Sequence, residues 1–225
     1  FQLPPVSKEP VPSREKFAFM SQAWVETAPT ICYLTEQFRQ KNNELNLILN
    51  QIRANEIEED AVRLLQETIE NQHSIEPTKL YSHNADVDRM NQKELHALEQ
   101  ESFTFFATKK GNQKMLEGFV KSLIVQEKLV LKKGAKVMFL KNDHDRGIMN
   151  GTIGLVTDFG KDAEGNGPFP LVQLMDKRKI LAKPEIWSIN NEKGSPLVSF
   201  EQVPLRLAWA ITVHKSQGMT LEAAE

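Results

Sequence analysis

Cysteine and long apolar runs are nearly absent from this sequence. Cys32 is the single cysteine among 225 residues, so no disulfide can form within the chain. Such sparse cysteine usage predicts an intracellular protein, of a bacterial cytoplasm or of a nucleus or mitochondrion. No apolar run approaches the roughly 18 residues that a membrane span needs, so no membrane partner is expected. Position 1 is Phe and no secretory pattern follows it, which predicts that both ends are cuts in a longer chain.

Complete catalytic motifs are missing as well. The nearest match to the phosphate-binding pattern G-x-x-x-x-G-K-[ST] runs from Gly154 to Lys161, with one residue too many between its glycines. Asp162 stands where the pattern needs a hydroxyl to hold magnesium. Five histidines and one cysteine show no zinc-ligand spacing, and no G-x-S-x-G motif occurs. We therefore expect that the chain alone binds neither a metal ion nor a nucleotide and is inactive by itself.

The composition that remains is ordinary for a globular protein, but its charge is unevenly placed. Hydrophobic residues make up 40% of the chain and charged residues 26%, and the net charge is −2. Residues 41–104 hold 6 Lys or Arg against 13 Asp or Glu, whereas residues 105–150 hold 10 against 4. The basic segment is either a solvated lysine-rich surface or a strip that follows nucleic-acid phosphates. Composition leaves both interpretations open.

Hydrophobic periodicity predicts helices in the first half of the chain. Residues 17–27 suit one short helix, and residues 43–70 show helical spacing with an interruption at Asn55 and Glu56. A short strand is predicted over residues 79–81, followed by a helix over residues 84–99.

From Gly134 onward the pattern predicts short strands joined by close turns. Asn150-Gly151 is typical of a type I′ hairpin turn, because both central residues of that turn need a positive φ. Several short strands in so short a segment indicate a small antiparallel barrel. Strands are predicted over residues 135–140, 152–159, 171–175, 179–183 and 185–189, with a turn at 165–168. The predicted core of the barrel consists of Phe139, Phe159, Phe169 and Trp187.

A polar segment closes the apolar run over residues 205–213, whose periodicity does not separate a helix from a buried strand. Thr212 to Gly218 packs hydroxyl, imidazole, ammonium and amide groups into seven residues. Donors at such a boundary suit phosphate oxygens. The alternative is a polar exit loop, and spacing alone leaves the two equally open.

Segments across the chain resemble, in order, the motifs of one family. The end of motif III is resembled by residues 1–6, and motif IV by residues 34–40. The opening of the second motor domain is resembled by residues 82–91, and the start of its insertion by residues 133–138 with 150–156. Motif V is resembled by residues 205–221. The family is the RecD-like superfamily 1 DNA helicases, and the match is to its petite-integration-frequency (Pif-type) branch.

The resemblance implies an α/β fold and a domain order. The expected fold is an incomplete RecA-like (P-loop NTPase type) second motor domain with an inserted small antiparallel SH3-like β-barrel. The expected domains are the tail of the first motor domain at 1–40, the first part of the second at 41–133, the barrel at 134–200, and the truncated continuation of the second at 201–225.

The resemblance also implies a function for the whole protein. That function is ATP-driven translocation along single-stranded DNA, expected in the 5′ to 3′ direction, with unwinding of duplex at junctions and a role in DNA repair and recombination. The resemblance implies that the whole protein is a monomer, that it includes a first motor domain, and that it uses ATP and Mg²⁺ as cofactors. By resemblance, Gln2 and Arg39 are catalytic, Gln217 and Gly218 contact the nucleotide, and Pro4, Pro5, His83, Asn84, Thr212, His214, Lys215 and Ser216 lie near DNA.

Simpler alternatives stand beside these roles. Arg39 could pair with Glu36 at helical spacing, Asn84 could cap a helix, and the two prolines could only stiffen a loop. Trp209 could offer a stacking face to a base, although its apolar neighbours favour a place in the core. The chain as a whole could instead be a non-enzymatic module that binds single-stranded DNA, or a degenerate scaffold domain.

Overall fold

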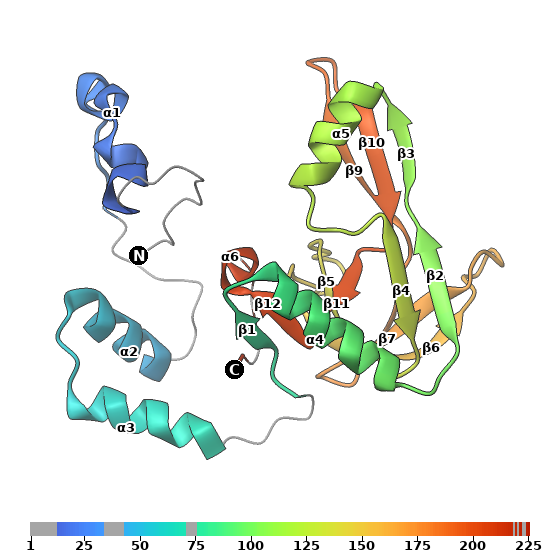
Figure 1. Ribbon diagram of the computed structural model, residues 1–225, viewed down its shortest axis with the longest axis horizontal. Coiled ribbons are helices and arrows are strands. Elements are labelled where there is room, and N and C mark those ends of the chain that lie inside the picture. Colours follow the sequence, from blue (N-terminus) through green and yellow to red (C-terminus); the bar gives the residue numbers. More distant parts are fainter. Residues whose placement is uncertain (1–12, 34–42, 71–75, 218, 220, 222–223) are drawn as a thin grey trace. The chain divides into compact units, whose positions relative to one another are not determined.

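The computed structural model describes residues 13–33, 43–70, 76–217, 219, 221 and 224–225, and the chain divides at Gln72 and His73 into two compact units (Figure 1). No helix among these residues is long and apolar enough to cross a membrane.

The first unit is helical, as its periodicity predicts. The predicted interruption of the 43–70 helix is confirmed, because Asn55 adopts a left-handed φ of 60° between α2 and α3. The single helix predicted over 17–27 is divided, because the Ser21 hydroxyl accepts from the Trp24 backbone N–H and caps a separate α1. The elements are η1 (Ser13–Lys16), η2 (Ala18–Met20), α1 (Gln22–Thr27), α2 (Asn43–Ala54), α3 (Glu59–Glu67) and η3 (Thr68–Glu70).

A parallel strand pair opens the second unit. Strand β1 (Lys79–Tyr81) pairs in parallel with β12 (Ala210–Thr212), which lies about 130 residues further along the chain. The predicted strand at 79–81 and helix at 84–99 are confirmed as β1 and α4 (Asn84–Ala97). Helix α4 packs against both strands of the pair, and β12 leads directly into the short helix α6 (Val213–Ser216).

A five-stranded antiparallel sheet forms the centre of the second unit. Its strand order is β11-β5-β6-β7-β8. Edge strands β11 and β8 are not paired with each other in the described part of the chain, so the predicted closed barrel is not formed. Closure fails because the last predicted barrel strand, β9, pairs with β10 in a separate sheet. The five strands are β11 (Leu205–Leu207), β5 (Lys136–Phe139), β6 (Ile153–Gly160), β7 (Phe169–Leu174) and β8 (Lys179–Leu181).

Two further sheets and a helix complete this unit. Strands β3 (Thr108–Gly111) and β9 (Glu185–Asn190) flank β10 (Pro196–Gln202), and β2 (Ser102–Phe106) pairs with β4 (Lys128–Lys132). Helix α5 (Gln113–Ser122) begins at Asn112, whose side chain accepts from two backbone N–H groups. The sequence patterns predicted β9, but not β2, β3, β4, β10 or α5.

The turn at Asn150 and Gly151 differs from the predicted type I′. The Thr152 backbone N–H donates to the Met149 carbonyl at 2.9 Å, but of the two central residues only Gly151 has a positive φ, of 99°. A type II turn has this requirement, whereas type I′ needs positive φ at both positions.

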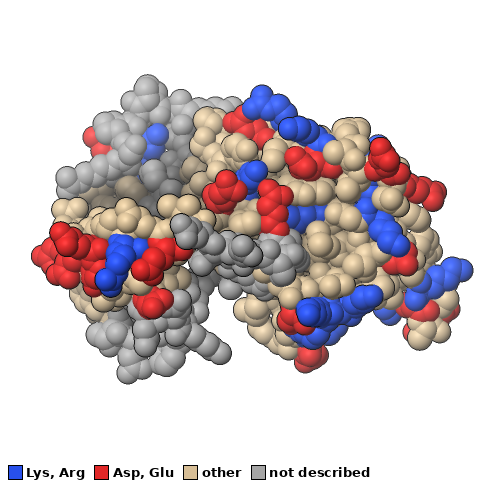
Figure 2. Space-filling view, turned by 90° about the horizontal axis from the view of Figure 1, so that it is seen from below, with Lys and Arg blue, Asp and Glu red and all other residues tan. Residues whose placement is uncertain are grey.

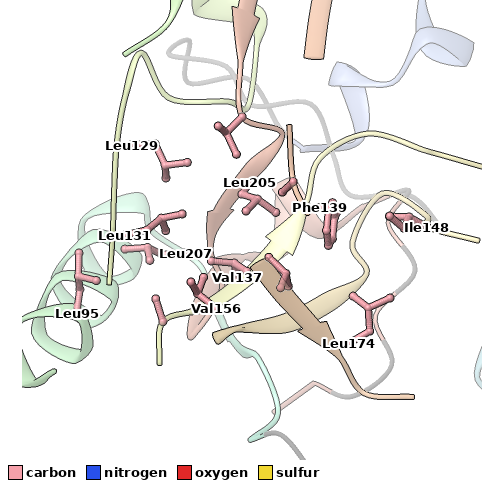
Figure 3. Close-up of a cluster of buried hydrophobic side chains, with 14 residues drawn as sticks. Leu95, Leu129, Leu131, Val137, Phe139, Ile148, Val156, Leu174, Leu205 and Leu207 are labelled. Atoms are coloured by element: carbon pink, nitrogen blue, oxygen red, sulfur yellow. The ribbon is translucent and has the colours of Figure 1, made fainter. Parts of the chain in front are cut away.

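The core of the second unit consists of two clusters of buried side chains. The larger one joins α4, β4 and the five-stranded sheet (Figure 3). Phe139 belongs to it and the half-buried Phe159 packs against it, so these two confirm part of the predicted barrel core. Trp187 lies on β9, outside the five-stranded sheet, and packs against the smaller cluster instead. Phe169 is half-buried and belongs to neither cluster. Trp209 packs against the larger cluster, which confirms the core alternative for that residue.

Candidate nucleic-acid interface

Two of the predicted DNA-binding segments lie at one edge of the second unit. Tyr81 lies opposite Thr212 in the parallel pair, so the residues that follow β1 and β12 leave the sheet side by side. His83 and Asn84 follow β1, and residues 213–216 follow β12. In α/β proteins the carboxyl ends of parallel strands are the usual place for ligands. The fold therefore brings together side chains that are far apart in the sequence.

Buried hydrogen bonds hold this edge in place. The Asn91 amide on α4 forms two hydrogen bonds with Ala210, donating to its carbonyl and accepting from its N–H, both at 3.0 Å. The buried Thr78 hydroxyl donates to the Ala208 carbonyl at 2.9 Å. Because β1 occupies the other side of β12, Asn91 satisfies backbone groups that would otherwise be buried and unpaired. Asn91 was not predicted as a site residue, and nothing in its local pattern marks it.

The predicted DNA-binding residues of this edge differ in their access to solvent. His83, Asn84 and His214 are exposed, whereas Lys215 and Ser216 are half-buried. Thr212 is buried, and its hydroxyl accepts from the Lys215 N–H at 3.3 Å, so it caps α6. Five of the six side chains are thus accessible from solvent, and Thr212 supports the turn beneath them.

The start of α4 differs from the alternative considered for Asn84. His83, not Asn84, occupies the N-cap position, and its side chain makes no capping hydrogen bond. The His83 ring nitrogen Nδ1 lies 2.7 Å from the Ser82 hydroxyl instead. The cap explanation for Asn84 is therefore wrong, and its amide is open to solvent.

A nucleotide cradle is not present in the described residues. Gln217 is exposed just after α6, and Gly154 to Lys161 lies in and just beyond strand β6, as its rejection as a phosphate loop predicts. The described part of the chain also holds no group of three His, Cys, Asp or Glu residues that could bind a metal ion. These residues do not fit ATP with Mg²⁺, so no step of ATP hydrolysis is assigned to them. Gln2, Pro4, Pro5, Arg39 and Gly218 lie outside the described residues.

The basic segment at 105–150 is not a continuous strip. Lys109 pairs with Glu127 at 2.7 Å and Lys141 with Glu185 at 3.1 Å. Lys136 is buried and donates to the Glu76 carbonyl, and burial lowers its pKa to about 8. Figure 2 shows basic and acidic side chains interspersed on the face that it draws. This arrangement favours the solvated lysine-rich surface over a phosphate-tracking strip.

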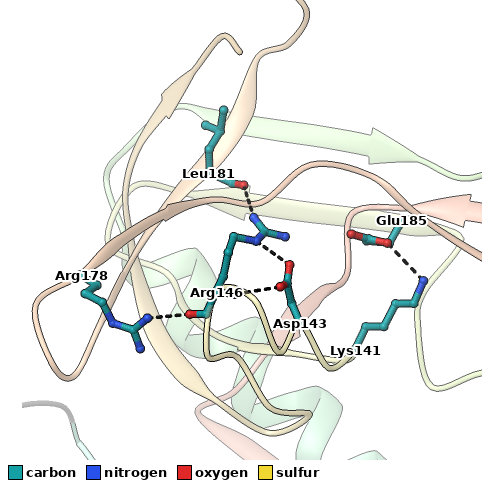
Figure 4. A network of polar contacts seen from close by, with 6 residues as sticks. All are labelled: Lys141, Asp143, Arg146, Arg178, Leu181 and Glu185. Atoms are coloured by element: carbon teal, nitrogen blue, oxygen red, sulfur yellow. Dashed lines mark hydrogen bonds and ion pairs between the residues drawn. The ribbon is translucent and has the colours of Figure 1, made fainter. Parts of the chain in front are cut away.

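Part of this segment belongs to a structural network (Figure 4). The backbone and side-chain N–H groups of Arg146 donate to Asp143 and hold the pKa of that carboxyl below its usual value. Arg146 also donates to the Leu181 carbonyl at 3.3 Å, and Arg178 donates to the Arg146 carbonyl at 2.6 Å. The network fastens the loop after β5 to the β7–β8 hairpin and gives Asp143 and Arg146 a structural role.

Comparisons with known proteins show what the chain is similar to. A family model described as the 2B domain of the DNA helicase Pif1 matches residues 115–159. The ATP-dependent DNA helicase Pif1 of Psychrobacter sp. (strain PRwf-1) is 38% identical over an alignment of 278 residues, which takes in 100% of this chain and 42% of that protein. The chain is related to the Pif1 DNA helicases.

Solved Pif1 structures agree with this relationship. The crystal structure of Bacteroides sp Pif1 in complex with ADP-AlF4 matches 99% of the chain, and the chain covers 53% of it, with a TM-score of 0.78 and 31% identity. Bacteroides Pif1 bound to ssDNA matches 100% of the chain, again covering 53% of that protein, with a TM-score of 0.54 and 32% identity. The predicted Pif-type resemblance and the α/β fold are confirmed. The chain spans about half or less of the length of these relatives.

Proposed function

We propose that this chain is the C-terminal motor half of an ATP-dependent DNA helicase, and that the whole protein moves along single-stranded DNA and unwinds duplex. The proposed direction is 5′ to 3′, and the proposed working form is a monomer with its own first motor domain. ATP and Mg²⁺ would bind mainly to that first domain, because the described residues of this chain hold no phosphate cradle. The chain alone is then inactive.

The parallel pair is the observation that carries this proposal. Two segments that resemble helicase motifs, near residues 83 and 214, meet at the carboxyl edge of β1 and β12. Their accessible imidazole, amide, ammonium and hydroxyl groups can donate hydrogen bonds to a DNA backbone. The similar proteins are ATP-dependent DNA helicases and include a Pif1 bound to ssDNA, which supports the same substrate for this chain.

The finer fold assignment belongs to this proposal. The parallel pair with α4 suits a RecA-like motor domain that continues at 201–225, and the antiparallel sheet suits an SH3-like insertion that is open rather than closed. The boundaries at residues 40, 133 and 200 remain predictions. Gln2 and Arg39 are proposed to act at the γ-phosphate, and Gln217 and Gly218 near the nucleotide.

ATP hydrolysis with and without single-stranded DNA tests the proposal. The samples are this chain, the whole protein that contains it, and the whole protein with Arg39→Ala or with Arg63→Ala. Removing an arginine that stabilises the transferring phosphoryl group costs roughly 10³-fold in turnover or more. Arg63 is the control, because it lies exposed on α3 and pairs only with Glu67.

The outcomes separate the helicase from its rivals. The helicase proposal is supported if this chain alone hydrolyses no ATP and the whole protein shows DNA-stimulated ATP hydrolysis. The role of Arg39 is supported if hydrolysis is lost with Arg39→Ala and kept with Arg63→Ala. Salt-dependent binding of single strand without any turnover supports the non-enzymatic binding module instead. A protein with neither turnover nor strand binding would be a scaffold domain.

A further inference from the structure

Arg206 on β11 is a cation buried in the second unit. Its side chain belongs to a residue that is only 7% exposed, and its Nε and Nη1 atoms have no hydrogen-bond acceptor among the described residues. A buried guanidinium that lacks acceptors is costly, so a native structure normally supplies a water molecule, an ion or a ligand. Arg206 is also the single charged residue in the apolar run at 205–213.

A small polar cavity lies beside this guanidinium. Its volume is about 20 Å³, and its walls are Asp88, Asn91 and Gln92 of α4, Gln126, Arg206 and Leu207. This is room for one water-sized group, such as a single phosphate oxygen, but not for a nucleotide. Asn91 has both amide atoms engaged with Ala210, which leaves Arg206 as the strongest donor in the cavity.

The charges around the cavity link it to the strand edge. Burial lowers the pKa of Lys215, and the positive charge of Arg206 lowers it further, so two cations lie near each other behind the residues that follow β12. Asp88 is close enough to oppose part of this effect, but it forms no ion pair with either cation in the described part of the chain. An anion that reaches this place would relieve the repulsion between the two cations.

We infer that Arg206 binds one backbone phosphate of the single strand, with a phosphate oxygen in the cavity and Asp88 as the group that opposes it. The inference rests on the proposed function, since it adds a strand contact to the same edge. In this arrangement Arg206 fixes the register of the DNA strand, because the planar guanidinium donates its hydrogen bonds in fixed directions. The negative charge of Asp88 repels the DNA phosphates and so weakens the binding of the DNA strand.

A cycle of paired changes tests this contact. The probes are single-stranded oligonucleotides in which one phosphate at a time is a neutral methylphosphonate. Binding by the whole protein is measured for the unchanged sequence and for Arg206→Gln and Asp88→Asn. Arg89→Gln and Asp86→Asn are matched controls, because they break an exposed ion pair on the same helix α4. A thermal melt checks that each variant is folded.

The expected result is specific to one phosphate. The unchanged protein should lose roughly tenfold in affinity at one position of the oligonucleotide, and Arg206→Gln should abolish that loss and lower the salt slope by about one. Asp88→Asn, which leaves the buried arginine intact, should bind the strand more tightly than Asp86→Asn does.

Two results overturn the inference. One is a set of methylphosphonate losses that is identical in the unchanged protein and in Arg206→Gln. The other, which decides the question if Arg206→Gln does not fold, is an Asp88→Asn protein that binds no more tightly than Asp86→Asn. Both leave the helicase proposal standing, whereas a whole protein that binds no strand at all ends both.

Discussion

Strands β11 and β12 are separated by two residues, Ala208 and Trp209, yet they belong to regions with different tasks. Strand β11 lies in an antiparallel sheet of five strands whose buried face is part of the larger core cluster. In the described part of the chain, strand β12 pairs with one strand, β1, and its Ala210 forms two hydrogen bonds with the Asn91 amide. The first region belongs to the larger apolar cluster, whereas the second combines apolar packing in the smaller cluster with buried side-chain hydrogen bonds. Changes in the two regions should therefore have different consequences.

The largest effect on stability is expected in the antiparallel region. Leu131→Ala on β4 removes a fully buried side chain from the larger cluster and should lower the free energy of unfolding by about 3 kcal/mol. Urea denaturation of the whole protein measures it, with Leu197→Ala, which is 43% exposed, as the control. Strand affinity per folded molecule should not change. A loss of affinity in the folded variant would show that the two regions are coupled.

Asn91→Ala should affect both stability and binding. It leaves the Ala210 N–H and carbonyl without partners in a buried site, which costs about 2 kcal/mol of unfolding free energy. Because the residues after β12 lose their support, affinity for single strand should fall as well. Denaturation and fluorescence anisotropy with an oligonucleotide measure the two changes. Lys93→Ala, on the exposed face of α4, should change neither.

Lys215→Gln should affect binding alone. The side chain is half-buried at the edge and makes no ion pair in the described residues, so its loss should lower strand affinity roughly tenfold with little change in the melting temperature. Lys133→Gln, an exposed lysine of the basic segment, is the comparison. An equal loss from Lys133→Gln would move the interface from the strand edge to that segment.

The effect expected at Lys136 is seen only as a change of stability with pH. Burial lowers its pKa from the usual 10.5 to about 8, so between these values the unfolded chain holds a proton that the folded chain does not. The unfolding free energy of the unchanged protein should therefore rise with pH from about 8 to 10.5, relative to Lys136→Met, by at most about 1.4 kcal/mol per pH unit. Denaturation curves at pH 7.5 and 9.5 measure this difference, and a constant difference would contradict the lowered pKa.

Local patterns were sufficient where neighbouring residues decide the structure. The helical spacing at 43–70 and 84–99, the break at Asn55 and the short strands after Gly134 follow from the residues themselves, and the structure confirms them. The patterns failed at residues 100–133, where β2, β4 and α5 alternate within a few residues of one another. Each of these elements is too short to show a clear period, and each is stabilised by partners elsewhere in the chain.

The sequence by itself determined the resemblance to Pif-type helicases, the apolar periodicity, and the polar residues at 83–84 and 212–216. Only the tertiary structure decided that these residues lie together, because β1 and β12 pair across about 130 intervening residues. It also decided that Thr212 caps a helix and that Lys136 is buried with a carbonyl partner. The Nε and Nη1 atoms of the buried Arg206, in contrast, have no hydrogen-bond partner among the described residues. Burial and pairing of these groups depend on contacts between distant segments, and no local pattern of residue types contains that information.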